Sequence, residues 1–309
     1  MTLLRLAGCL IPVAVAFAFN DRFTLSLLAF ASMQALYVAS WDLLGGVSGQ
    51  TSLGHALPFG CGAYAAAFVS MWGVVPPPAA LALGGLAGAA AGALQGALGA
   101  RLRRVSLAVL TLATAEIAHE IAAMLELSGP GGILVGGEGG IPAVVFPPGE
   151  AGAARLVAAV LASALIALLW LGSTSLGLAM RTVRADDRLA AASGIDVARV
   201  RLLAFLVAGA TAGVAGAFTA TVAGGASPAA LALNASLFAV AITWVGGPGT
   251  IVGPALAAYA GSLALQWLGP PEMLRLVLSA LVLIGAGLAP GPGRHAGLLR
   301  MRLEGPRRA

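Results

Sequence analysis

Long apolar stretches, separated by short polar or glycine-rich breaks, run through almost the whole chain. A helical stretch of about 17 to 24 apolar residues is long enough to cross the hydrocarbon core of a bilayer, which is about 30 Å thick. Ten such stretches can be drawn, at residues 3–19, 24–41, 55–75, 79–100, 105–127, 154–172, 202–223, 229–245, 250–268 and 274–290. The pattern predicts an all-α polytopic membrane protein, with residues 1–309 forming one transmembrane domain, a bundle of about ten helices.

The composition supports this fold class and limits which reactions the chain could carry out by itself. Hydrophobic residues make up 59% and charged residues 9% of the chain, whereas soluble proteins have about 25% charged residues. The chain contains no lysine, and a Walker A loop needs a lysine to reach the nucleotide phosphates. Any ATP-driven step therefore requires another chain. The two cysteines, Cys9 and Cys61, lie in apolar stretches and indicate neither a disulfide nor a metal framework, and we expect no cofactor.

The arginines predict the orientation, because cytoplasmic loops of membrane proteins carry an excess of positive charge. With both termini in the cytoplasm, only Arg22, Arg155 and Arg275 of the seventeen arginines lie outside. We expect a multi-pass protein of a bacterial inner membrane, with an extracytoplasmic loop at 128–153. The basic C-terminal tail is expected to contact anionic lipid and not nucleic acid.

Residues 173–201 are a charged island between two apolar stretches. Asp186 or Asp187 can cap a short helix, Gly194 suits the left-handed residue after it, and Asp196 can cap the next helix. A helical stub with small side chains can fit a groove on a partner, although a solvated charged loop is the alternative. The residues expected to take part in docking are Arg181, Arg184, Asp186, Asp187, Arg188, Ala191 and Gly194.

Residues 41–55 contain four glycines and six polar side chains. Such a segment cannot form a lipid-facing helix, and irregular backbone at membrane depth occurs only where protein or a watery cavity satisfies its polar groups. We therefore predict a broken or re-entrant segment near 42–55 that lines a substrate path, with an ordinary cytoplasmic turn as the alternative. The side chains expected to line this path are Asp42, Ser48, Gln50, Ser52 and His55.

The stretch at 105–127 carries Glu116, His119 and Glu120 on one helix face. Ionisable groups in a membrane usually face the protein interior or a cavity. Glu116 is nearest the middle of the stretch and is a further candidate for the path. A structural hydrogen bond between helices, and a proton relay or metal site, remain the alternatives.

Glycine recurs at every fourth position in the stretch at 79–100, which leaves one helix face without side chains. Such a face allows close approach of a second helix. We expect it to pack within the chain or against a sister subunit, and the residues concerned are Gly84, Gly88, Gly92 and Gly96.

Four sequence blocks, in order, carry a resemblance to a known family. Residues 49–56, GQTSLGHA, with GCGAY at 60–64, resemble the G-Q-x-S-L-G-H-A…G-x-G-A-Y signature of LivM-type permeases of branched-chain amino-acid ABC importers. TLATAEI at 111–117, the charged island with the helix after it, and GGPGT at 246–250 are similar to three further blocks.

The resemblance implies a permease subunit that moves branched-chain or related hydrophobic amino acids inward by alternating access, and that is not itself an enzyme. It implies a related second permease, two ATPase subunits and an extracytoplasmic substrate-binding protein as partners, with the charged island as the coupling helix on the ATPase. Asp42 stands where the family usually has Asn, and Thr114 where Phe is common.

Three other functions remain open from the sequence. Permeases of similar signature serve urea, so an importer of urea or short amides is one alternative. A proton-coupled secondary transporter could use Glu116, His119 and Glu120. An intramembrane serine protease would pair Ser48, in the sequence GVSG, with His119.

Overall fold

The computed structural model describes residues 2–268 apart from 74–75, 103, 130–133 and 144–150. Helices occupy nine of the predicted stretches, and the tenth, 274–290, lies outside the described residues. The α-helices are α1 (Thr2–Ala18), α2 (Arg22–Trp41), α3 (Ala56–Met71), α4 (Pro77–Gly99), α5 (Arg104–Met124), α6 (Ala151–Ser173), α7 (Ser175–Ala185), α8 (Asp187–Ala192), α9 (Val197–Ala223), α10 (Leu233–Gly246) and α11 (Val252–Leu268).

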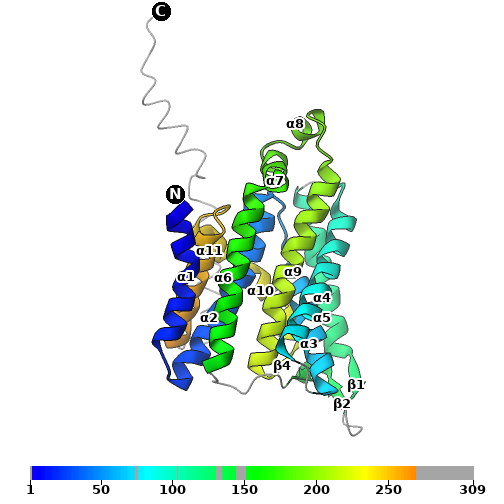
Figure 1. Ribbon diagram of the computed structural model, residues 1–309. Coiled ribbons are helices and arrows are strands. Elements are labelled where there is room, and N and C mark those ends of the chain that lie inside the picture. The colour runs from blue at the N-terminus through cyan, green and yellow to red at the C-terminus, as the bar shows by residue number, and fades with distance from the viewer. Residues whose placement is uncertain (1, 74–75, 103, 130–133, 144–150, 269–309) are drawn as a thin grey trace, which may run out of the picture.

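The long helices lie side by side along one axis (Figure 1), with α7 and α8 projecting at the end where α1 begins. This end is called the loop end. Within the described residues, five helices are long and apolar enough to cross a membrane, and several shorter apolar helices accompany them. The chain is therefore a polytopic membrane protein, while the predicted count of ten rests also on the shorter helices and on 274–290.

Short strands at the opposite end correct the all-α prediction to a mostly helical one. β1 (Glu126–Ser128) pairs with β2 (Leu134–Gly136), and β3 (Ile141–Pro142) pairs with β4 (Gly225–Ala226), both antiparallel. Two 3-10 turns, η3 (Gly137–Gly139) and η4 (Pro228–Leu231), lie beside them. This end of the bundle is called the hairpin end.

Glycines allow α4 to lie against α9 at backbone distance. A Cβ added at Gly88 would lie 2.3 Å from the carbonyl oxygen of Gly209, which is far inside van der Waals contact. Gly84, Gly92 and Gly96 extend the same close approach along α9. The glycine face predicted from the sequence thus packs within this chain, where the absence of side chains lets the two backbones touch.

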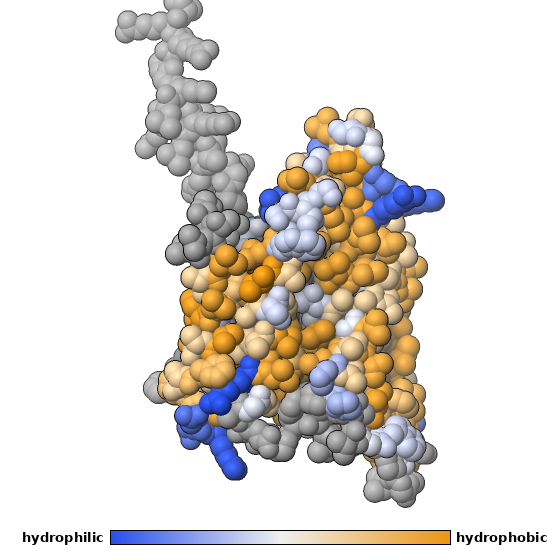
Figure 2. All heavy atoms as spheres, viewed as in Figure 1, coloured by the Kyte–Doolittle hydropathy of each residue, from blue (hydrophilic) through white to orange (hydrophobic). Residues whose placement is uncertain are grey.

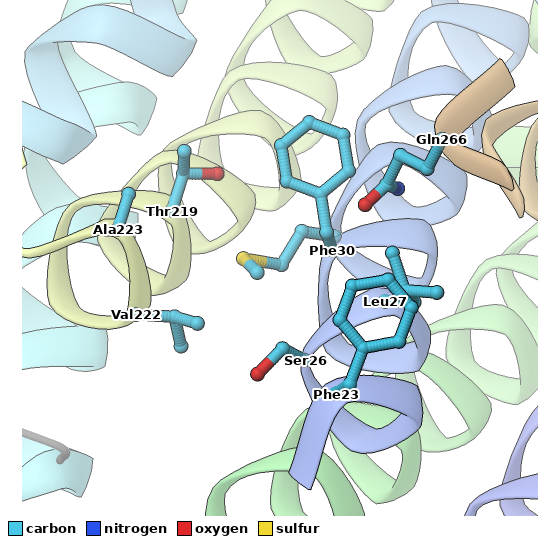
Figure 3. Close-up of a pocket in the computed structure, with 9 residues that line it drawn as sticks. Phe23, Ser26, Leu27, Phe30, Thr219, Val222, Ala223 and Gln266 are labelled. Atoms are coloured by element: carbon cyan, nitrogen blue, oxygen red, sulfur yellow. The ribbon is translucent and has the colours of Figure 1, made fainter. Parts of the chain in front are cut away.

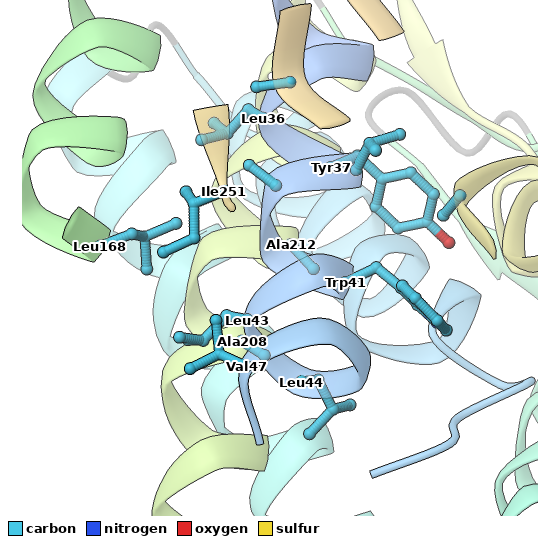
Figure 4. Close-up of a cluster of buried hydrophobic side chains, with 14 of the residues drawn as sticks. Leu36, Tyr37, Trp41, Leu43, Leu44, Val47, Leu168, Ala208, Ala212 and Ile251 are labelled. Atoms are coloured by element: carbon cyan, nitrogen blue, oxygen red, sulfur yellow. The ribbon is translucent and has the colours of Figure 1, made fainter. Parts of the chain in front are cut away.

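The largest cluster of buried apolar side chains lies toward the loop end. Figure 4 shows Leu43 and Val47 meeting Ala208 of α9, with Ile251 and Leu168 of α6 close by. Apolar side chains also cover the middle of the outer surface (Figure 2), as expected where lipid surrounds the bundle. The core therefore surrounds the very segment that the sequence marked as irregular.

Candidate gating segment and coupling loop

α2 does not end in a simple turn. It continues as a π-helix, η1 (Asp42–Val47), after which the backbone is irregular until α3 begins at Ala56. π-helical turns are rare and occur often at functional sites. Gly49, with a φ of +73°, supplies the left-handed residue that directs the chain out of η1. Residues 48–55 are the candidate for a gate and are called the gating segment below.

Side chains from four helices satisfy the backbone of the gating segment. Trp41 Nε1 of α2 donates to the carbonyl of Ser52 at 2.9 Å, and Gln95 of α4 donates to the carbonyl of residue 54 at 3.0 Å. The hydroxyl of Thr111 of α5 accepts the N–H of residue 53 at 3.1 Å. The hydroxyl of Ser236 of α10 accepts the N–H of residue 56, where α3 begins, at 2.9 Å.

These contacts place the second half of the gating segment inside the bundle. The α4–α5 connection lies at the loop end, where Arg201 donates to the carbonyls of residues 100 and 102. Thr111 lies two turns further along α5, about 10 Å from that connection. The irregular backbone at this depth is enclosed by protein, which is the condition under which a membrane protein tolerates it.

His55 closes the gating segment against α2. Its ring is 1% exposed and stacks on Tyr37, with ring centroids 5.4 Å apart. Nε2 lies 2.8 Å from the hydroxyl of Ser40. The imidazole therefore joins the beginning of α3 to α2 by one polar and one aromatic contact.

Asp42 is completely buried and connects η1 to a distant turn. Its two carboxylate oxygens accept the backbone N–H groups of Gly249 and Ile251 at 2.7 and 2.8 Å. Ile251 has a φ of 64°, a left-handed conformation that a β-branched residue rarely adopts. The hydrogen bonds to Asp42 help to hold the turn 247–251 in this strained form.

Arg184 of α7 lies against the same two segments. Its Nη1 donates to the carbonyl of Gly46 in η1. A Cβ added at Gly49 would lie 2.7 Å from Arg184 Cγ, and one at Gly249 would lie 2.7 Å from Nη1. Arg184, Asp42, Gly46 and the turn 247–251 are together called the clasp.

The charged island at 173–201, the candidate for coupling to a partner, is called the coupling loop below. It has the helical stub and caps expected from its sequence. Asp186 accepts the N–H groups of Arg188 and Leu189 at 2.7 and 3.2 Å and so caps α8. Gly194 has a φ of +82°, and Asp196 accepts the N–H of residue 199 at the start of α9. α8 is fixed at both ends by local hydrogen bonds.

One salt bridge fastens the stub to the bundle. Arg201 of α9 contacts Asp187 at 2.5 Å, and the same guanidinium donates to the two carbonyls of the α4–α5 connection. By contrast, Arg181, Arg188 and Ala191 are exposed. Leu189 is 66% exposed. The stub thus presents Leu189 and Arg188 outward from an anchored base, and Arg181 is exposed on α7, the helix before it.

The polar face of α5 lies in the least buried of the five candidate spans. His119 Nδ1 lies 2.9 Å from the carbonyl oxygen of Pro228 and so ties α5 to η4. Glu116 is half-buried and Glu120 is exposed. Within the described part of the chain, no hydrogen bond joins these three side chains into a relay, and no group of three or more His, Cys, Asp or Glu residues could hold a metal ion.

The remaining predicted path residues are buried. Ser48 is 1% and Gln50 is 3% exposed, and the Ser48 hydroxyl has no hydrogen-bond partner among the described residues. Ser48 lies beside the clasp, whereas His119 contacts η4 near the hairpin end. The structure does not bring this serine and histidine together.

A pocket of about 210 Å³ lies between α2, α9 and α11, distant from the clasp (Figure 3). Phe23, Phe30 and Val222 line it, with Thr219 and Gln266 as polar neighbours. Among the residues that the structure describes, no charged side chain lines it. Its apolar walls suit an aliphatic group.

Sequence reasoning missed several residues that shape the gating segment. Gln95 is the one polar side chain in the apolar stretch 79–100, a signal that could have marked it. Ser40 and Ser236 carry no such signal, since serine is common in membrane helices. Thr111 was noted as part of a sequence block and not as a hydrogen-bond partner.

The helical bundle, with its enclosed irregular segment and anchored polar stub, defines a polytopic membrane protein. The family model described as "Branched-chain amino acid transport system / permease component" matches residues 23–287. The chain belongs to this family. Neither the curated proteins nor the solved structures contain a significant match to it.

Proposed function

We propose that this chain is a permease subunit of an ABC importer that moves branched-chain amino acids inward by alternating access. Membership of the permease family supports the transport role. The observation that carries the ATP-driven mechanism is α8, an exposed stub anchored at its base by Arg201. The chain has no lysine for a nucleotide-binding loop, so separate ATPase subunits would supply the energy.

The loop end would then face the cytoplasm. Exposed arginines of the coupling loop lie there, which agrees with the excess of positive charge on cytoplasmic loops. The chain would reside in a bacterial inner membrane with both termini in the cytoplasm. An extracytoplasmic binding protein would deliver substrate to the hairpin end and its loop at 128–153.

A second, related permease would cover α5. This helix carries Glu116 in a span of which 28% is buried, and a carboxylate facing lipid would be costly. A partner helix or a shared aqueous path would remove this cost. Glu116 is therefore proposed to face the partner permease or the path. The other wall of the path would include Asp42 of η1 and the gating segment with Ser48, Gln50, Ser52 and His55.

The first test is gentle purification of the tagged chain from native membranes, with identification of partners by mass spectrometry. We expect a second permease and ATPase subunits bearing Walker A loops. Leu189→Glu should abolish ATPase recovery because it places a carboxylate on the exposed stub. Leu134→Glu is the matched control, since both leucines are 66% exposed and Leu134 lies at the hairpin end.

The purified complex is then reconstituted in liposomes with ATP inside and labelled leucine or urea outside. Uptake of leucine that depends on ATP supports the proposal. Uptake of urea instead would replace the substrate assignment. Uptake by the single chain under a proton gradient, with no ATPase present, would contradict the importer mechanism.

A further inference from the structure

The clasp brings together three segments that are far apart in the sequence. Arg184 belongs to α7, Gly46 to η1, and Gly249 to the turn before α11, and all three lie in direct contact. Asp42 joins η1 to the same turn by two hydrogen bonds. Any movement of α7 relative to the bundle must therefore shift Arg184 against both segments or break its contacts.

Arg184 differs from its neighbours in the coupling loop. Arg181 and Arg188 are exposed, whereas Arg184 is half-buried and directs Nη1 to a backbone carbonyl inside the bundle. α7 leads directly through Asp186 into the exposed stub α8. One end of this helical unit is thus available to a partner, while Arg184 reaches inward to the gating segment.

The backbone around the clasp is closely packed. A Cβ added at Gly46 would lie 1.8 Å from Asp42 Oδ1 and 2.4 Å from the Gly249 nitrogen. Ile251, with its strained left-handed backbone, comes two residues after Gly249. A close-packed junction of this kind transmits small displacements instead of absorbing them, because packed interiors have low compressibility.

We propose that Arg184 is a positioning residue that fastens the coupling loop to the gating segment and to the turn 247–251. A force applied to α8 by a docked ATPase moves the gating segment and the turn 247–251 through the Arg184 side chain. The hydrogen bonds of Asp42 keep this turn in position against η1. The inference rests on the proposed function, which it deepens: Arg184 acts within the bundle and not as a contact to the ATPase.

The first arm of the test uses the single chain in lipid nanodiscs. Ser48→Cys replaces a buried hydroxyl beside the clasp with a thiol of similar size, and Cys9 and Cys61 are replaced by alanine. Labelling by a hydrophilic maleimide should be slow in this parent and faster by about tenfold or more with Arg184→Gln. This factor corresponds to loss of a hydrogen bond from a charged donor.

The second arm uses the reconstituted complex and measures solute transported for each ATP hydrolysed. Arg184→Gln should retain the ATPase subunits and ATP hydrolysis but lower this ratio about tenfold, the same factor as above. Arg184→Lys keeps the charge and should restore part of the ratio. Arg199→Gln removes an exposed arginine at the same end, whose side chain is 84% exposed, and is the matched control.

The outcomes distinguish the role of Arg184 from the proposed function of the chain. Loss of the ATPase subunits with Arg184→Gln would make Arg184 a partner contact and overturn the clasp. A labelling rate or a transport ratio for Arg184→Gln that equals the value for the parent would also overturn the clasp. A parent chain that recruits no ATPase contradicts the proposed function itself, and the coupling role of Arg184 falls with it.

Discussion

Gly88→Ala tests the backbone contact between α4 and α9 most directly. The added Cβ would lie 2.3 Å from the Gly209 carbonyl oxygen and 2.6 Å from the Gly213 Cα. Ordinary contact needs about 3.5 Å, so the two helices must separate by about 1 Å. A gap of this size forfeits about a quarter to a half of the dispersion attraction of each atom pair along the seam.

Overpacking in a tight interface costs about 1–3 kcal/mol. Alanine regains about 1 kcal/mol of helix propensity over glycine, which offsets part of this cost. Gly85→Ala provides the matched control, because it has the same propensity gain. Its Cβ would meet only the Val214 side chain at 3.0 Å and the Ala210 carbonyl oxygen at 3.7 Å.

The assay is thermal unfolding of the purified chain in detergent, followed by tryptophan fluorescence. The net cost of about 0–2 kcal/mol lowers the midpoint by up to about 8 °C for a chain of this size. Gly85→Ala should leave the midpoint unchanged or raise it. Equal midpoints for the two variants would refute the reasoning that the α4 glycines are required by the approach of α9.

Three further changes test the polar contacts. Asp42→Asn keeps one acceptor oxygen but turns an amide N–H toward the second backbone N–H. We therefore expect the free energy of unfolding to fall by about 1–3 kcal/mol. An unchanged unfolding midpoint would count against the clasp geometry. Thr111→Val leaves a partly buried N–H of the gating segment without its acceptor and should cost about 1–3 kcal/mol as well. The control Thr211→Val, whose hydroxyl bonds only within its own helix, should cost less. Arg201→Gln should increase proteolysis of the coupling loop more than Asp187→Asn does, because Arg201 also holds two carbonyls; equal cleavage would show that the salt bridge alone anchors α8.

Local signals in the sequence predicted the coupling loop well. The caps at Asp186 and Asp196 and the left-handed Gly194 depend on residues only a few positions apart, and the structure has all three. The positions of the long helices followed from apolar runs in the same way. Such features are decided by nearby residues, so one sequence is sufficient to find them.

The clasp could not be predicted, because its partners are distant in the sequence. Asp42 and Ile251 are separated by 209 residues, and nothing in either block indicates the other. Arg184 was expected, with Arg181 and Arg188, to offer its charge to a docking partner. Its inward direction depends on Gly49 and Gly249, which have no side chains to exclude it.

The bond between Asp42 and the turn 247–251 also constrains how the protein is made. Asp42 is synthesised early, but the N–H groups of Gly249 and Ile251 that its carboxylate requires arrive only after α10 has been synthesised. Until then a buried carboxylate lacks its partners, and Arg184 lacks one wall of its site. The contact between α7 and the turn 247–251 can therefore form only in a nearly complete chain, whereas the caps of α8 and the Arg201 salt bridge can form earlier.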